Sequence, residues 1–187
     1  SQKTCDPYSN EPSRSDDLKT LKLKPYNGQS SLYNLRQKFI TPVEWWYIRN
    51  HHPVPIIKEE DYFLTLKTPQ LQRMYTLSEL KEFPEVTIVN TVQCAGNRRR
   101  DFQQHGKVLG LNWDGGAIST GAFTGVKIKD ILADNDINYH TYPNLSNLYL
   151  NLYGYDLPFD ASIPLERVLN EDSEVMLAYQ MNLEPLT

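Results

Sequence analysis

The most informative segment of the chain reads Glu85-Val86-Thr87-Ile88-Val89-Asn90-Thr91-Val92-Gln93-Cys94-Ala95-Gly96-Asn97-Arg98-Arg99-Arg100. Its first nine residues are rich in Val, Ile and Thr and predict a strand. Cys94 follows at the end of this strand, before two small residues and three guanidinium groups. Neighbouring cations lower the pKa of a thiol, and small residues at 95 and 96 let a bulky ligand approach the sulfur. The pattern favours a reactive thiolate; a buried structural cysteine beside a solvated basic turn is the alternative.

A second candidate, Arg49-Asn50-His51, lies upstream of this segment. The aromatic and β-branched run Val43 to Ile48 precedes it and predicts a strand or a short helix. Pro53 and Pro55 follow and make the stretch a rigid, extended loop. A rigid loop that carries Arg and His can bind an anion. The alternative is that a histidine caps a turn and Arg49 forms an ordinary ion pair.

A third candidate, the glycine-rich loop Gly110 to Thr120, lies downstream and contains Trp113. It fits neither of the glycine patterns that bind nucleotide phosphates, so a P-loop is a poor match. Close approach of its backbone to another ligand stays open, beside the alternative of a plain turn with a core tryptophan.

The remaining pattern predicts short elements without regular alternation of strands and helices. We expect strands at Asp61 to Lys67, Leu148 to Tyr153 and Val175 to Met181, and short helices at Thr76 to Lys81, Val126 to Asn135 and Ile163 to Leu169. The fold class is therefore α+β, with mixed, irregular sheets and short helices. Residues 1–40 are polar and interrupted by prolines, and predict an extended N-terminal arm packed on a domain formed by 41–187.

Composition narrows the function classes. The 187 residues are 40% hydrophobic and 22% charged, the balance of a globular domain, and the formal net charge is −4. A chain with a net negative charge has no overall positive electrostatic field that would attract nucleic acid. Any anion that it binds must therefore be held by locally placed Arg or Lys side chains. No apolar run approaches the roughly 18 residues that cross a bilayer, and no signal-peptide core is visible, so we expect no membrane partner. Cys5 and Cys94 do not predict a disulfide framework.

Together the three candidates resemble one family, the molybdenum-cofactor domain of sulfite oxidases and the related assimilatory nitrate reductases. The resemblance covers nearly the whole chain in one order. The segments that carry it are Pro7 to Pro12, Thr41-Pro42, Arg49-Asn50-His51 with Pro53-Val54-Pro55, Leu77 to Pro84, Val92 to Arg99, Trp113, Gly116 to Thr120, Ala161 to Leu165 and Leu177 to Asn182. The pair of Cys94 to Arg99 with the upstream Arg-Asn-His loop is far more specific than either motif alone.

The resemblance implies a role for individual residues. Cys94 corresponds to the cysteine whose thiolate binds molybdenum. Tyr47, Ile48, Arg49, Asn50 and His51 match the segment that lines the pterin, and Asp156 is expected at an acidic pterin-binding position. Arg49, Arg99 and Trp113 match pocket residues that hold the oxyanion substrate, so Arg49, Cys94, Arg99 and Trp113 form the expected catalytic set.

The activity implied is oxidation of sulfite to sulfate by oxo transfer at a molybdenum-molybdopterin cofactor. Electrons then pass to oxygen or a cytochrome, and no haem is expected in this chain. The resemblance places such enzymes in the mitochondrial intermembrane space or the peroxisome. Members continue beyond the position of Thr187 with further contacts and a dimerisation domain, so we expect a cofactor domain incomplete at its C-terminus and a homodimer only for the full-length protein.

Three alternatives stay open at this stage. Gly116 to Thr120 reads like the sulfite oxidase loop, which favours that subfamily over an assimilatory nitrate reductase. A truncated, non-catalytic module that only binds cofactor is the second alternative. A cysteine hydrolase that pairs Cys94 with His51 or His105 is the third, although no spacing specifies it.

Overall fold

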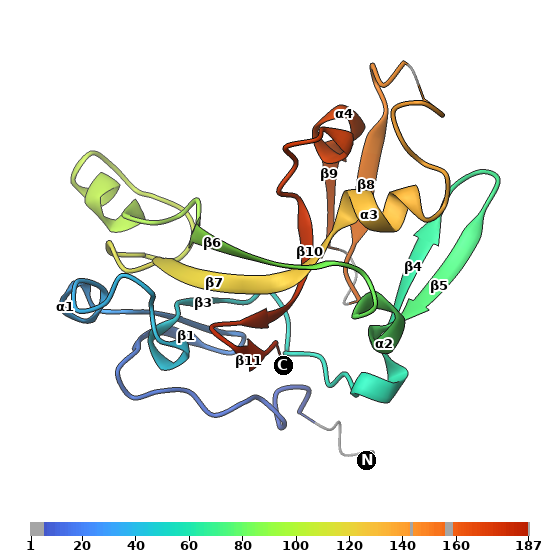
Figure 1. The fold of residues 1–187 in the computed structure, drawn as a ribbon. Coiled ribbons are helices and arrows are strands. Elements are labelled where there is room, and N and C mark those ends of the chain that lie inside the picture. The colour runs from blue at the N-terminus through green and yellow to red at the C-terminus, as the bar shows by residue number, and fades with distance from the viewer. Residues whose placement is uncertain (1–5, 143, 156–158, 187) are drawn as a thin grey trace, which may run out of the picture. The chain divides into compact units, whose positions relative to one another are not determined.

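The computed structural model describes residues 6–142, 144–155 and 159–186. The chain divides into two compact units, of which the first contains Ser1–Val54 and Val89–Ala122 and the second Pro55–Ile88 and Phe123–Thr187. Small sheets and short helices make up both units (Figure 1), which confirms the predicted α+β class. In the described part of the chain, no helix has the length and apolar character needed to cross a membrane. The division into an arm and a domain stays a prediction.

The first unit contains a three-stranded antiparallel sheet in the order β1-β2-β3. The strands are β1 (Lys19–Leu23), β2 (Tyr26–Gln29) and β3 (Ile48–Arg49). All four residues of the central strand β2 are buried. Asn27 of β2 lies opposite Arg49 of β3. The sheet thus places the start of the Arg-Asn-His loop beside a buried strand.

Two short helices connect β2 to β3. Helix α1 (Leu32–Leu35) begins after Ser31, whose hydroxyl accepts a hydrogen bond from the backbone N–H of Asn34 at 3.0 Å. The 3-10 helix η1 (Val43–Trp45) follows, and the chain then extends into β3. The run predicted as a strand or a short helix therefore contains a helical turn and the entry to a strand.

Strand β6 (Glu85–Gln93) has the predicted bounds and pairs with β7 (Ile118–Lys127) in a four-stranded sheet ordered β11-β10-β7-β6. Both strands pass from one unit into the other. At their first-unit ends, the backbone N–H of Cys94 donates to the carbonyl of Ala117 at 3.0 Å. Ile118, Ser119 and Thr120 belong to β7 and not to the loop in which the sequence pattern placed them, because sheet pairing overrides a weak local preference.

The core of the first unit is a small aromatic cluster. Tyr47, Trp113 and Ala117 are buried, and Cys94 packs against them. The rings of Tyr47 and Trp113 meet edge to face, with centroids 6.5 Å apart. Trp113 is fully buried. The core of this unit therefore joins the Arg-Asn-His loop, the Cys94 turn and the glycine-rich loop.

The second unit contains a hairpin of β4 (Phe63–Lys67) and β5 (Gln72–Thr76), preceded by the 3-10 helix η2 (Glu59–Asp61). Helix α2 (Leu77–Leu80) begins directly after β5 with a capping box, in which Thr76 and Glu79 bond each other's backbone N–H groups. The strand predicted from Asp61 is confirmed from Phe63 onward, because Asp61 belongs to η2. The capped helix predicted for Thr76 to Lys81 is confirmed as Leu77–Leu80, with Thr76 and Lys81 as its two caps.

A second hairpin and two helices complete this unit around an aliphatic core. The elements are α3 (Ile128–Ala133), β8 (Tyr149–Tyr153), β9 (Asp160–Pro164) and α4 (Leu165–Leu169). The buried residues of the core are Leu132, Ile137, Leu145, Leu165, Val168 and Leu169. Helix α4 contributes Leu165, Val168 and Leu169 to this core, at the spacing that places side chains on one face of a helix.

Strand β10 (Met176–Met181) pairs with β7 and with the short β11 (Glu184–Pro185), and it confirms the predicted last strand. The helix predicted from Val126 begins two residues later, because Val126 pairs with Leu177 as part of β7. The helix predicted from Ile163 begins at Leu165, because Ile163 pairs with Leu150 in the β8–β9 hairpin. In both places the strand pairing extends into the predicted helix.

Candidate active site

A cavity of about 290 Å³ lies in the first unit. Its walls come from β1, β2, the Arg-Asn-His loop, the Cys94 turn and the glycine-rich loop. The lining residues are Lys22, Pro25, Asn27, Arg49, Asn50, His51, Arg99, Gly110, Leu111 and Trp113. Three of these described residues are cations, and none is an Asp or Glu. The cavity is therefore suited to an anion.

Arg49 extends into this cavity from the end of β3. Its Nη1 donates to the carbonyl of Asn50 at 2.7 Å and to Oδ1 of Asn27 at 3.3 Å, and its Nη2 lies 3.5 Å from Nδ1 of His51. All of these partners are uncharged or weakly basic. No carboxylate pairs with Arg49 among the described residues. The guanidinium charge thus stays available, and the ordinary ion pair considered for Arg49 does not form in this part of the chain.

The three arginines after the Cys94 turn have different partners. Arg98 pairs with Asp101 at 2.7 Å, and Arg100 pairs with Asp114 at 3.0 Å. Arg99 instead donates to the carbonyl of Leu111 at 3.2 Å and lines the cavity. Of the three, Arg99 is the one without a carboxylate partner among the described residues.

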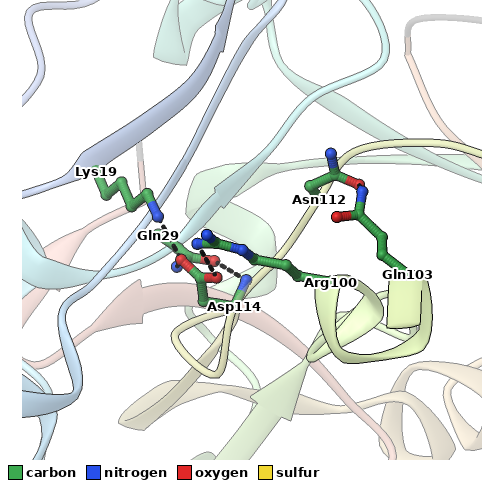
Figure 2. Close-up of polar contacts among 6 residues, drawn as sticks. All are labelled: Lys19, Gln29, Arg100, Gln103, Asn112 and Asp114. Atoms are coloured by element: carbon green, nitrogen blue, oxygen red, sulfur yellow. Dashed lines mark hydrogen bonds and ion pairs between the residues drawn. The ribbon is translucent and has the colours of Figure 1, made fainter.

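Asp114 is the centre of the polar cluster shown in Figure 2. Lys19, Gln29 and Arg100 all donate to its carboxylate, and its own N–H donates to Oε1 of Gln29 at 2.8 Å. The hydrogen bond from Lys19 lowers the pKa of Asp114 below its ordinary value of 3.8, and Arg100 lowers it further, against the opposing effect of burial. Asp114 thus ties the basic turn after Cys94 to strands β1 and β2.

We expect Asp114→Asn to lower the free energy of unfolding by about 1–2 kcal/mol at neutral pH, because two charge-assisted hydrogen bonds lose their charge. A lowered native pKa means that this stabilisation is complete above about pH 4 and is lost as the pH falls further. Denaturant titrations at pH 7 and pH 3 measure both effects. Asp101→Asn, which breaks only an exposed pair, is the control and should cost at most about 0.5 kcal/mol. Equal losses in the two variants would contradict the role given to Asp114.

The guanidinium of Arg99 lies between two glycine backbones. A Cβ at Gly110 would come within 2.5 Å of Nη1 of Arg99, and one at Gly96 within 2.8 Å of its Nη2. Gly110 also has a φ of +98°, a conformation that suits glycine. Gly96, which was expected to let a ligand approach the sulfur, makes room for Arg99 in this structure.

Cys94 lies half-buried at the end of β6, and its Sγ accepts a hydrogen bond from the N–H of Gly96 at 3.3 Å. The sulfur packs with the Tyr47 and Trp113 cluster and does not line the cavity itself. Burial raises the pKa of Tyr47, and the nearby charge of Cys94 raises it further. Within the described residues, no group of three His, Cys, Asp or Glu side chains could hold a metal ion.

The histidines considered as partners of Cys94 form other contacts. His51 lies beside Arg49, and Nε2 of His105 lies 3.1 Å from Nε2 of Gln104. Neither forms a hydrogen bond with Cys94 in the described part of the chain. The arrangement therefore lacks the nucleophile and base contact of a cysteine hydrolase.

The structure brings most of the predicted site residues together. The cavity is lined by Arg49, Asn50, His51, Arg99 and Trp113. Tyr47 and Ile48 directly precede Arg49 in the sequence but do not line the cavity. Asp156 lies outside the described residues. The sequence pattern did not indicate Lys22, Pro25 and Asn27, which lie within the predicted N-terminal arm. A buried Asn-Gly pair inside β2 resembles a turn in sequence, so no local signal marked Asn27 as a site residue.

Comparisons with known proteins identify the family of this chain. The family model described as "Oxidoreductase molybdopterin binding domain" matches residues 51–187. Mitochondrial sulfite oxidase of Homo sapiens is 37% identical over 98% of this chain and 34% of its own length. Nitrate reductase [NADH] 2 of Phaseolus vulgaris is 33% identical over 87% of this chain and 19% of its own length. The chain spans about a third of the length of the first curated relatives it matches.

A solved structure supports the fold. The sulfane dehydrogenase SoxCD from Paracoccus pantotrophus superposes with a TM-score of 0.72 at 22% identity, covering 98% of this chain and 50% of that one. The chain belongs to the oxidoreductase molybdopterin-binding domain family. This confirms the predicted family and, with it, the molybdenum-molybdopterin cofactor.

The first unit fits such a cofactor on its own evidence. Nδ2 of Asn50 is buried and has no hydrogen-bond partner among the described residues, although Asn50 lines the cavity. A buried, unpaired amide is costly, and a polar ligand in the cavity would pair with it. Cys94 supplies a soft sulfur at the adjoining core cluster. An amide donor and a thiolate together match the chemistry of a pterin that carries molybdenum.

Proposed function

We propose that this chain forms the cofactor-binding part of an enzyme that oxidises sulfite to sulfate. The observation that carries the proposal is one cavity with two guanidinium groups, Arg49 and Arg99, neither of which has a carboxylate partner among the described residues. Sulfite is a small oxyanion, and guanidinium groups bind such oxygens with two parallel hydrogen bonds. The relatives named sulfite oxidase support the choice of substrate.

The residues have separate tasks in this reaction. Arg49 and Arg99 hold the oxygens of sulfite and leave its sulfur lone pair free to react, and Trp113 forms part of the wall beside them. Cys94 would bind the molybdenum, and Asn50 and His51 would contact the pterin from the cavity wall, with Tyr47 and Ile48 just before them in the chain. Asp156, which lies outside the described residues, is the further pterin contact that the family resemblance implies. When bound, the cofactor supplies the two-electron redox chemistry. The reaction consumes sulfite and water and yields sulfate, two protons and two electrons, which pass to oxygen or a cytochrome.

The size of the cavity agrees with a shared site. The cavity has a volume of about 290 Å³ and is partly open to solvent. One sulfite ion with four non-hydrogen atoms fills only part of it. The remaining space, which Asn50 and His51 line, is left for the edge of a larger ligand such as the pterin.

Nitrate reduction is the second candidate, favoured by the match to the Phaseolus vulgaris enzyme. Nitrate is also an oxyanion that two guanidinium groups can hold, so the cavity itself does not separate the two. Steady-state assays of the complete, molybdenum-loaded protein do: we expect sulfite-dependent reduction of an electron acceptor and no nitrate-dependent oxidation of a donor. The reverse result would replace the proposal by nitrate reduction. Molybdenum bound at about one atom per chain without either activity would indicate a non-catalytic module.

We expect Gly110→Ala to weaken anion binding about tenfold, because the new Cβ would displace the guanidinium of Arg99. A calorimetric titration of the protein with sulfate measures the affinity. Gly106→Ala is a matched control, since Gly106 also has a positive φ of +156° but has no atom within 4 Å of the added Cβ. Loss of affinity in both variants would assign the effect to the backbone and would contradict the role of Arg99.

A further inference from the structure

Asn27 is a buried residue of β2 in the cavity wall, and both polar atoms of its side-chain amide form hydrogen bonds. The residue is 1% exposed. Its Nδ2 donates to the carbonyls of Pro25 and Asn50, both at 3.0 Å. Its Oδ1 accepts from the N–H of Asn50 at 3.2 Å and from Nη1 of Arg49 at 3.3 Å. A buried amide with four partners is a fixed element, because every alternative orientation leaves polar groups unpaired.

Three of these four bonds reach the Arg-Asn-His loop. Asn27 contacts both the N–H and the carbonyl of Asn50, much as a neighbouring strand would, and it does so just where β3 ends. The carbonyl of Asn50 in turn accepts from Nη1 of Arg49 at 2.7 Å. The amide of Asn27 therefore fixes the backbone that orients Arg49 and also contacts the guanidinium directly.

The absence of charge on Asn27 is as important as its shape. Oδ1 neutralises no part of the guanidinium charge, whereas a carboxylate at the same position would form an ion pair with Arg49 and compete with a bound anion. An asparagine thus holds Arg49 in place and leaves its charge for the ligand. Aspartate has almost the same shape but would pair with the charge of Arg49 and would not leave it for the ligand.

We propose that Asn27 is a positioning residue, which holds Arg49 and Asn50 in the geometry that binds the oxyanion substrate and keeps the charge of Arg49 unpaired. The proposal rests on the proposed function for its substrate, but the hydrogen bonds that carry it belong to the chain itself. Asn27 acts through Arg49 and Asn50 and need not touch the substrate.

The test uses sulfate binding to the cofactor-free protein and sulfite kinetics of the complete, loaded protein. Asn27→Asp should weaken sulfate binding about tenfold or more and raise KM for sulfite more than it lowers kcat. Asn90→Asp adds the same charge on an exposed position of β6 and is the matched control, with an affinity within about twofold of the parent. An unchanged affinity in Asn27→Asp would overturn the proposal.

Asn27→Ala, an uncharged variant, separates positioning from a general loss of structure. It should weaken sulfate binding in the parent and have an effect below about twofold when Arg49 is already replaced by Gln, because coupled residues are not additive. An equal effect in both backgrounds would contradict action through Arg49. Hydrogen exchange of the Asn50 N–H should rise about tenfold in Asn27→Ala while exchange in β7 stays the same.

The two proposals fail in different ways. A parent that binds sulfate through Arg49 but does not oxidise sulfite would remove the proposed function and leave the role of Asn27 in place. A parent that binds no sulfate would also count against the proposed function, and the exchange of the Asn50 N–H then decides: unchanged exchange in Asn27→Ala overturns the positioning role, and faster exchange supports it.

Discussion

Replacing Cys94 by serine is expected to abolish sulfite turnover in the complete protein while leaving the fold largely intact. The thiolate is a soft ligand that suits molybdenum, whereas an alkoxide is harder and much more basic, so serine would stay protonated. The fold has little dependence on the sulfur. The backbone N–H of residue 94 bonds to Ala117, and a hydroxyl can still accept from the N–H of Gly96.

Steady-state sulfite oxidation and thermal unfolding of the same preparations measure the two parts of this expectation. We expect a residual rate of at most about 1% of the parent, which corresponds to a loss of roughly 3 kcal/mol or more in transition-state stabilisation. Cys5→Ser is the control, since Cys5 lies in the polar N-terminal segment and matches no site residue of the family. Retention of a substantial rate in Cys94→Ser would remove Cys94 from the metal, and a large loss in Cys5→Ser would mean that the N-terminal segment is misread.

Replacing Arg49 by glutamine is the second large effect that we expect. Glutamine keeps some hydrogen bonding but removes the charge, and a lost charge-assisted contact to a small oxyanion costs about 2–4 kcal/mol. This corresponds to a decrease of roughly 30-fold to 1000-fold in kcat/KM for sulfite. The structure strengthens the expectation, because no carboxylate neutralises Arg49 among the described residues and its known partners are Asn27, Asn50 and His51.

Arg49→Lys distinguishes charge from geometry. Lysine restores the charge without the planar fork, so only part of the activity should return. The measurement is kcat/KM for sulfite in molybdenum-loaded protein, with unfolding followed in parallel. If Arg49→Gln stayed within about twofold of the parent, or if its whole effect were lost stability, Arg49 would be a structural residue of a rigid loop.

Elements with a strong local signal were predicted well from the sequence. Strand β6 is rich in β-branched residues, and α2 carries a complete capping box, so local chemistry determined both. Strand β7 was missed because two glycines and an alanine weaken its intrinsic preference, and pairing with β6 and β10 forms it nevertheless. The starts of α3 and α4 were placed too early for the same reason, since neighbouring strands pair with the residues there.

The candidate site residues that could be predicted from the sequence are those that lie close together in one segment. Arg49, Asn50 and His51 are consecutive, and Arg99 lies close to Cys94, so each motif was visible by itself. Lys22 and Asn27 reach the cavity only because β1 and β2 pair with each other and with β3. The sequence also gave no indication that Arg98 and Arg100 pair with Asp101 and Asp114, and that Arg99 differs from both neighbours.

The central claim, that this site oxidises sulfite, is tested most directly by a single turnover. Complete, molybdenum-loaded protein is mixed without oxygen with one equivalent of sulfite, and sulfate is quantified. The account predicts about one sulfate per molybdenum in the parent and almost none in Arg49→Gln on the same time scale. Stoichiometric metal with no sulfate formed by the parent would contradict it.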